Sequence, residues 1–159
     1  AHPEINWIAI EKKFSRAKKI EAKAKAHHLK NLMVIYGEAY LASRLYFNAE
    51  SCEAAFINFP DPWPKRRHAK NRLIQPKFID QVCRILKQDT LFTLVTDDPE
   101  YSRQMLEEMR AHIGFRCGFP QPYYISEYPG YGSSYFEQLW REKGKTIRYH
   151  QFQKLRPTS

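Results

Sequence analysis

The chain has 159 residues, a length that suits one domain with a sizeable core. Its 43% hydrophobic and 14% aromatic content excludes an intrinsically disordered chain. The excess of 26 Lys and Arg over 17 Asp and Glu gives a formal net charge of +9. This charge favours a polyanionic partner, although a merely basic surface would carry it too. No apolar run approaches the ~20 residues that span a bilayer, and no signal-peptide pattern opens the chain.

The cysteines Cys52, Cys83 and Cys117 lie far apart and form no C-x-x-C pair. An odd, scattered set argues against a disulfide framework and a structural zinc site, and it suits a reducing cytoplasm. We expect buried, unreactive thiols, because apolar residues lie near all three. His27 and His28 are adjacent, and adjacent helical side chains do not face a common ligand. We therefore expect no metal site.

Apolar runs and turn residues divide the chain into alternating strands and helices. In chain order they predict a strand over residues 5–10, a helix over 14–28, strands over 32–36 and 53–59, a helix over 73–86, a strand over 90–96 and a helix over 99–112. Weaker patterns predict a strand over 115–119, a helix over 133–143 and a strand over 146–152. This alternation predicts an α/β fold with a parallel sheet.

Acidic residues follow the first four predicted strands. They are Glu11, Glu38 after Gly37, Asp61 after Pro60, and the pair Asp97-Asp98. The carboxyl ends of parallel strands share one edge of a sheet, where ligands bind. Helix capping accounts for one or two of these acids, and Pro99 after Asp98 is typical of a helix start. The pattern as a whole predicts a functional cluster of carboxylates.

The stretch NFPDPWPKRRH over residues 58–68 is the most informative in the chain. Its three alternating prolines stiffen the backbone and withhold N–H donors that would extend the sheet. The loop therefore holds Asp61 and Trp63 in fixed positions. A run of cations follows without an acid among them, namely Lys65, Arg66, Arg67, Lys70 and Arg72. A solvated surface loop would explain the cations, but not an aspartate held at a strand exit beside them.

Here the sequence resembles the tRNA (guanine-N7)-methyltransferase family, whose hallmark is FPDPW-x-K-x-R-H-x-K-x-R. The chain reads FPDPWPKRRHAKNRLIQPKF, and the segments IAIEKK, GEA, LVTDDPEY and SSYFEQ resemble further family signals. The resemblance implies an α/β, class I S-adenosylmethionine-dependent methyltransferase fold, a Rossmann-like three-layer sandwich. It also implies S-adenosylmethionine as methyl donor and a guanine in the variable loop of tRNA as acceptor.

The resemblance and the chemistry of the side chains together assign the site residues. Asp61 corresponds to the catalytic aspartate. Cofactor binding falls to Glu11, Glu38 and Asp61; substrate binding to Lys65, Asp97, Ser134, Tyr135, Phe136 and Glu137; and RNA contacts to Arg67, His68, Lys70 and Arg72. Trp63 and Tyr135 are candidates to stack on an extruded base, with core packing as the alternative. Glu38 departs from the Asp or Asn that the family commonly has.

The family's first strand and glycine-rich cofactor loop have no counterpart before Ala1. We therefore expect residues 1–159 to be a single methyltransferase domain that lacks this strand, with unpaired edges on the strands that would flank it. One alternative function is a non-catalytic tRNA-binding module or inactive fragment. Another is an amino-group methyltransferase, although Asp61 stands where that motif needs an aromatic residue. The oligomeric state stays open.

Overall fold

The computed structural model describes residues 3–132 and 134–156, except for the side chain of Arg66. The chain divides into two compact units, Ala1–Phe47 and Asn48–Ser159. Among the described residues, no helix is both long and apolar enough to cross a membrane.

The first unit is a parallel β-α-β motif followed by a helix. Its elements are β1 (Trp7–Glu11), α1 (Phe14–Ala26), β2 (Leu32–Tyr36) and α2 (Ala39–Tyr46). The strands pair in register from Trp7 opposite Leu32 to Glu11 opposite Tyr36. Helix α2 was not predicted from the sequence. It has only eight residues and no side-chain hydrogen bond at its N-cap, so it lacks a start signal.

The second unit is built on a four-stranded sheet in the order β3-β4-β6-β5. Its elements are β3 (Cys52–Asn58), the 3-10 helix η1 (Arg66–Asn71), α3 (Pro76–Ile85), β4 (Leu86–Thr96), α4 (Pro99–Ala111), β5 (Phe115–Cys117), α5 (Tyr135–Glu142) and β6 (Arg148–Lys154). The predicted elements are all present, with ends shifted by a few residues. Ser133, where the last helix was expected to begin, lies outside the described residues.

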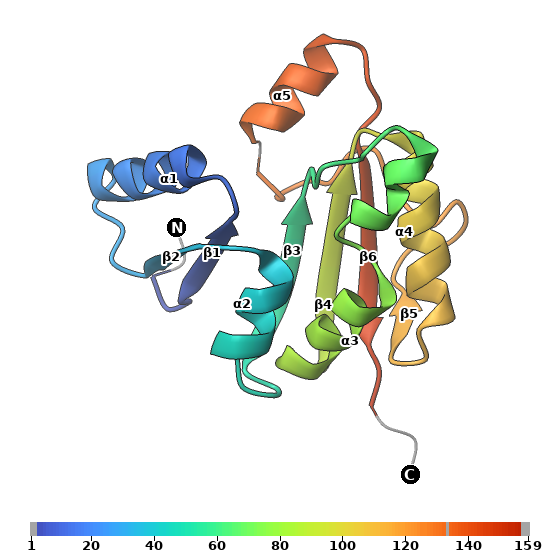
Figure 1. Ribbon diagram of the computed structural model, residues 1–159, viewed down its shortest axis with the longest axis horizontal. Coiled ribbons are helices and arrows are strands. Elements are labelled where there is room, and N and C mark those ends of the chain that lie inside the picture. The colour runs from blue at the N-terminus through green and yellow to red at the C-terminus, as the bar shows by residue number, and fades with distance from the viewer. Residues whose placement is uncertain (1–2, 133, 157–159) are drawn as a thin grey trace. The chain divides into compact units, whose positions relative to one another are not determined.

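The expectation of a wholly parallel sheet is wrong, because β6 runs antiparallel to both β4 and β5. Strands β3 and β4 pair in parallel, and β5 runs in the same direction, so β6 is the one strand reversed among the four described. The reversal occurs because the chain from β5 returns through α5 to the end of the sheet where β4 finishes (Figure 1). Strand hydrophobicity does not encode direction, so the sequence pattern could not show it.

Helices α3 and α4 lie over the same face of this sheet (Figure 1). Both present buried apolar side chains to it, namely Phe78, Ile79, Val82 and Ile85 from α3 and Tyr101, Met105 and Met109 from α4. The opposite face carries a second apolar cluster, in which Val95, Ile147 and Tyr149 are buried beneath Ile125, Tyr128 and Tyr131. Successive side chains of a strand point to opposite faces of the sheet, so one sheet contributes to two apolar cores.

Strands β1 and β3 each pair on one side only in the part of the chain that the structure describes. Among the described residues, β1 pairs with β2 alone and β3 pairs with β4 alone. Their other edges carry backbone N–H and C=O groups that a neighbouring strand could pair.

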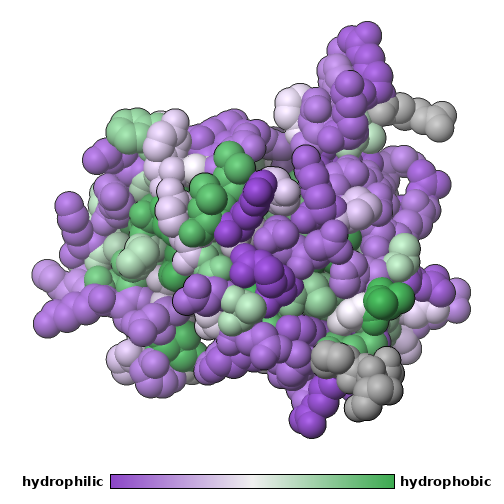
Figure 2. Space-filling model, turned by 60° about the horizontal axis from the view of Figure 1, so that its bottom comes forward, coloured by the Kyte–Doolittle hydropathy of each residue, from purple (hydrophilic) through white to green (hydrophobic). Residues whose placement is uncertain are grey.

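The surface is mainly hydrophilic, in agreement with a mean hydropathy of −0.65. Figure 2 shows one face on which hydrophobic groups are interspersed among hydrophilic ones. The three cysteines are free but only partly buried, which corrects the expectation of fully buried thiols. Burial still raises the pKa of Cys83 and Cys117, so neither is an activated thiolate.

Candidate active site

The loop after β3 has a strained backbone. The Phe59 amide donates to the Val95 carbonyl at 2.9 Å, so the loop starts in line with the sheet. Phe59 and Trp63 then take positive φ angles of 50° and 45°, a region that bulky residues rarely adopt. Such strain persists only where surrounding contacts hold it, and it is concentrated at functional sites.

Asp61 lies between these two strained residues. Its side chain is exposed, and it accepts no hydrogen bond and forms no ion pair with any residue that the structure describes. An aspartate in a rigid loop that uses its carboxylate for no structural contact is available to a ligand. The structure thus places Asp61 where the sequence predicted it, at the carboxyl end of β3.

Arg72 does not lie on the surface as an RNA contact would. Its side chain is only 8% exposed. Its Nε donates to the Pro62 carbonyl at 2.6 Å and its Nη1 to Gln104 Oε1 at 2.5 Å. A guanidinium with these partners is withdrawn from phosphate, which corrects the expectation for this residue.

Three other cations of this segment, Lys65, Arg67 and Lys70, are exposed. Lys65 precedes η1, and Arg67 and Lys70 lie within it. His68 is half-buried, with its ring edge-on to Trp63 at 5.9 Å between centroids. Trp63 is half-buried too, so it belongs to the loop's own packing as much as to its surface.

A cavity of about 210 Å³ lies beside the ends of β3 and β4. It is lined by Asn58, Phe59, Val95, Tyr131, Gly132, Ser134 and Glu137. The Tyr131 hydroxyl donates to Asn58 Oδ1 at 2.7 Å across its wall. Both residues were missed from the sequence, because a separation of 73 residues along the chain leaves no local signal.

Ser134 and Glu137 meet at this cavity. Ser134 Oγ caps α5 by accepting from the Glu137 amide at 3.1 Å. The Glu137 carboxylate is 13% exposed and accepts from Arg141 Nε at 3.1 Å. It also hydrogen-bonds the Tyr149 hydroxyl, and burial together with this carboxylate raises the pKa of Tyr149. Hydrogen bonds from Arg141 and Tyr149 therefore hold the Glu137 carboxylate at the cavity.

The two aromatic residues of the same segment have different environments. Phe136 is half-buried and its ring lies 6.2 Å from that of Phe59. Tyr135 is 69% exposed, so the core-packing alternative for it is wrong.

The adjacent acids Asp97 and Asp98 have separate roles. Asp98 caps α4 by accepting from the Tyr101 amide at 2.7 Å. Asp97 is 11% exposed and its Oδ2 pairs with Lys145 Nζ. That ammonium also lies 4.0 Å from the centre of the Trp140 ring. Asp97 and Glu137 are thus both partly buried carboxylates with a cationic partner.

Two of the three acids expected to bind the cofactor, Glu11 and Glu38, lie in the first unit. Glu11 ends β1, and its Oε1 accepts from the Lys13 amide at 2.7 Å. Glu38 precedes α2, is exposed and lies 3.9 Å from Lys12 Nζ. The Gly37 amide donates to the Glu11 carbonyl at 3.1 Å, so both acids lie at the carboxyl end of the two-stranded sheet.

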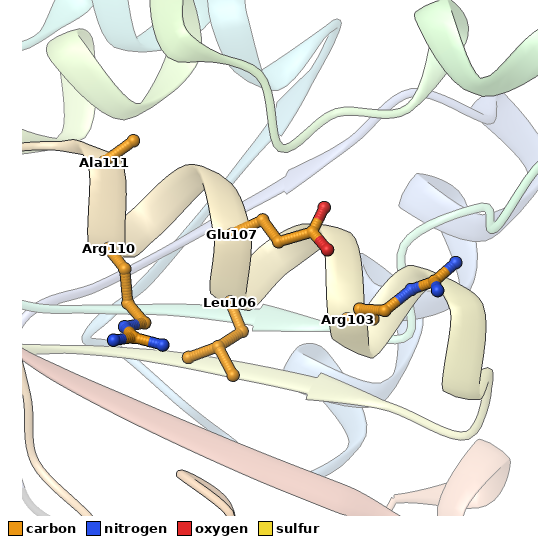
Figure 3. A pocket seen from close by; sticks show the side chains of 5 residues that line it. All are labelled: Arg103, Leu106, Glu107, Arg110 and Ala111. Carbon is orange, nitrogen blue, oxygen red and sulfur yellow. The ribbon is translucent and has the colours of Figure 1, made fainter.

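A second hollow, of about 490 Å³, lies along α4 and does not have the features of a binding site. Figure 3 shows its lining residues Arg103, Leu106, Glu107, Arg110 and Ala111, all on this one helix. Arg103 is already paired with Glu100 at 2.9 Å. Among the described residues, no group of three His, Cys, Asp or Glu side chains could hold a metal ion.

Comparisons with known proteins identify the family. The model of a family described as "Putative methyltransferase" matches residues 1–149. A tRNA (guanine-N(7)-)-methyltransferase of Chlamydia pneumoniae is 40% identical over 150 residues, which make up 94% of this chain and 66% of that protein. The corresponding protein of Chlamydia caviae is 41% identical over 155 residues, or 96% and 67% of the two chains.

The chain belongs to the tRNA (guanine-N7)-methyltransferase family. It spans about two thirds of the length of these relatives. Among solved structures, a SAM-dependent methyltransferase from Aquifex aeolicus has a TM-score of 0.63 at 12% identity, covering 94% of this chain and 69% of that one. The fold is that of the S-adenosylmethionine-dependent methyltransferases, as the resemblance implied.

Within this family fold, the second unit brings together several of the predicted site residues. Ser134 and Glu137 line one cavity with Phe59. Phe59 lies in the same loop as Asp61, two positions before it in the chain. Glu11 and Glu38 share an end of the other sheet. An acidic residue at the carboxyl end of a parallel strand matches the hydroxyl groups of a ribose, so the side chains present fit S-adenosylmethionine.

Proposed function

We propose that this chain carries out methyl transfer from S-adenosylmethionine to N7 of a guanine in the variable loop of tRNA. The observation that carries the proposal is the exposed Asp61 carboxylate, which has no hydrogen-bond or ion-pair partner among the described residues, in a strained loop that is followed by exposed cations. The names of the relatives support the same reaction. The alternative of an amino-group methyltransferase has no support among them.

The chemistry asks for a positioned carboxylate rather than a base. Guanine N7 is an unprotonated acceptor with a lone pair, so no proton must leave before it is methylated. S-adenosylmethionine, when bound, supplies an electrophilic methyl group. Positive charge then develops on the guanine ring. Asp61 stabilises this charge and orients the ring, an electrostatic role for which a fixed position matters most.

Asp97 and Glu137 are suited to recognise the Watson–Crick edge of the guanine. Its N1–H and exocyclic amino group are donors that one carboxylate can accept together. Both carboxylates are held in place by a cation, Lys145 for Asp97 and Arg141 for Glu137. An ionised carboxylate has about four acceptor sites, so one cationic partner leaves capacity for a base.

The exposed residues Lys65, Arg67 and Lys70 bind the tRNA backbone, with Lys65 nearest to Asp61 along the chain. The half-buried His68 lies in the same segment and contacts the RNA with the exposed part of its ring. Phosphate neutralisation releases counterions, so these cations contribute affinity that depends on salt. The exposed Tyr135 ring is available to stack on a base taken out of its stack.

Glu11 accepts hydrogen bonds from the ribose hydroxyls of S-adenosylmethionine, and Glu38 accepts from its adenine amino group. The support for these roles is their common place at the carboxyl end of the two-stranded sheet. The cytoplasm, where tRNA is modified, is the proposed location, and the free cysteines suit it.

The test is to incubate the full natural protein with unmodified tRNA and S-adenosylmethionine, and then to map the modified nucleoside. We expect 7-methylguanosine in the variable loop. Methylation of another atom or another guanine would contradict the assignment. Tight tRNA binding without any transfer would instead favour the alternative of a non-catalytic tRNA-binding module.

A further inference from the structure

The buried guanidinium of Arg72 contacts the loop after β3, which carries Asp61. Arg72 is 8% exposed, although its side chain carries a cationic guanidinium group. A buried charge is tolerated only when hydrogen bonds or other charges compensate for the loss of water. Arg72 meets this need with the Pro62 carbonyl and the Gln104 side chain, and its guanidinium lies 5.0 Å from the centre of the Tyr101 ring.

Gln104 and Tyr101 are themselves fixed, since both belong to α4. Tyr101 is fully buried, and its hydroxyl accepts from the Ile74 amide at 3.1 Å. Burial raises the pKa of Tyr101 to about 12, so the hydroxyl stays neutral. Gln104 Nε2 donates to the Ile74 carbonyl at 3.4 Å. Arg72 therefore joins the loop to a rigid helix.

The prolines restrict the backbone of this loop, but they leave it few hydrogen bonds of its own to fix its position against the rest of the unit. Pro60, Pro62 and Pro64 have no N–H to donate. The φ angles of Phe59 and Trp63 are unfavourable for aromatic residues. Arg72 donates a hydrogen bond to the carbonyl oxygen of Pro62, and Pro62 follows Asp61 directly in the chain.

We propose that Arg72 is a positioning residue for methyl transfer, which holds the Pro62 carbonyl and thereby keeps Asp61 at the exit of β3. Gln104 is the second positioning residue, because it orients the guanidinium from α4. This inference rests on the proposed function. It replaces the phosphate contact that the motif alone suggested for Arg72.

The kinetic test uses Arg72→Lys in the full natural protein. Lysine keeps the charge but lacks the planar fork that reaches two acceptors at once. We expect kcat to fall about 10- to 100-fold, because a small displacement of a catalytic group has effects of this size. KM for tRNA and the salt dependence of tRNA binding should stay within about twofold of the unaltered protein.

Two further variants calibrate this result. Arg67→Gln removes an exposed cation of the same motif, so it should raise KM for tRNA and flatten the salt dependence. Arg103→Gln removes an exposed arginine on α4 outside the site and should leave the kinetics unchanged. If Arg72→Lys behaves like Arg67→Gln, Arg72 is a phosphate contact and the proposal is overturned.

Hydrogen–deuterium exchange tests the support of the loop without any activity. In Arg72→Lys, backbone amides in the segment 59–72 should exchange faster, whereas those of β4 and β6 should keep their protection. Unchanged exchange in this segment would overturn the proposal even if the protein methylates no tRNA. Should Arg72→Lys fail to fold, Gln104→Met removes one anchor at similar volume and should shift exchange and kcat in the same directions. Normal values in Gln104→Met would count against the proposal.

Discussion

Asp61 differs from the other acidic residues near the strand ends in what its carboxylate does. Glu11 accepts from a backbone amide of its own turn, Asp98 caps a helix, and Asp97 pairs with Lys145. Asp61 is exposed and has no such partner among the described residues. A side chain that contributes nothing visible to folding can be replaced with little effect on stability but with a large effect on chemistry.

Replacing Asp61 with Asn tests this separation. The amide keeps the shape but loses the negative charge, so kcat of the full natural protein should fall about 10²- to 10³-fold, the effect of one preorganised electrostatic group. The midpoint of urea unfolding should stay the same. Asp80→Asn, at an exposed aspartate outside the site, is the control. Near-normal turnover in Asp61→Asn would sink the proposed role.

His150 is the buried titratable group with the clearest structural role. It is fully buried, its Nδ1 lies 2.9 Å from the Tyr123 carbonyl, and its Nε2 lies 2.8 Å from Ser102 Oγ. A carbonyl only accepts, so Nδ1 carries the proton and Nε2 accepts from the Ser102 hydroxyl. Burial lowers the pKa of His150 to about 4, since the charged form loses its water.

Stability should therefore depend on pH through His150. The unfolded chain binds a proton near pH 6.5, and the folded chain only near pH 4. The contribution of neutral His150 is complete above pH 6.5 and is lost as pH falls towards 4, up to roughly 3 kcal/mol. Urea unfolding at pH 7.5 and pH 5 should show this loss. In His150→Gln the difference between the two pH values should shrink, and an equal difference would exclude His150 as its source.

At the scale of elements, α4 has the best-defined start in the structure. Asp98 Oδ1 accepts from the Tyr101 amide at 2.7 Å, the Asp98 amide donates to Thr96 Oγ1 at 3.1 Å, and Pro99 occupies the first turn. Asp98→Ala should lower the free energy of unfolding by about 1 kcal/mol, because an N-terminal amide loses its acceptor. Asp98→Asn should lose less in the same urea titration. Equal losses in the two variants would contradict a capping role.

The segment around η1 is the element that should determine the salt dependence of tRNA binding. Changing Lys65, Arg67 and Lys70 together to Gln should lower the slope of log affinity against log salt by about 2 to 3, roughly one phosphate contact for each cation. Lys19, Lys23 and Lys25, exposed on α1, provide a control with the same change in charge. Binding would be measured by filter retention across a salt series. Equal slopes for the two triple variants would mean that only net charge matters.

At the scale of the whole molecule, the two units differ in how much they bury. The residues buried in the first unit are Ala17, Ala24, Ala42 and Ser43, all small. The second unit buries most of the large side chains, including Phe78, Phe92, Leu94, Tyr101 and Phe152. A two-stranded sheet with so small a core is marginal in water, whereas four strands covered by helices suffice.

The two units should therefore behave differently when made separately. Residues 48–159 should unfold cooperatively on heating, as followed by far-UV circular dichroism. Residues 1–47 should show no cooperative transition under the same conditions. A sharp transition in the 1–47 peptide would mean that local helix and strand preferences stabilise it without a larger core.

The sequence by itself determined the features that depend on neighbouring residues. The apolar runs of β2 and β4, the Asp98-Pro99 helix start and the rigid proline loop around Asp61 were all predicted, because propensity, capping and backbone restriction act over a few residues. The family motif added the expected chemistry. Helix α2 escaped prediction because its eight residues are shorter than the window over which a helical pattern can be recognised.

Only the tertiary structure decided the features whose partners lie far apart in the chain. Arg72 is buried and donates to the Pro62 carbonyl, and it also donates to Gln104, which lies 32 residues away in the chain. The tertiary structure also reversed β6 against β4 and joined Tyr131 to Asn58. Hydrogen bonding and burial depend on which side chains meet in space, and a cation in a sequence looks the same whether water or a carbonyl surrounds it.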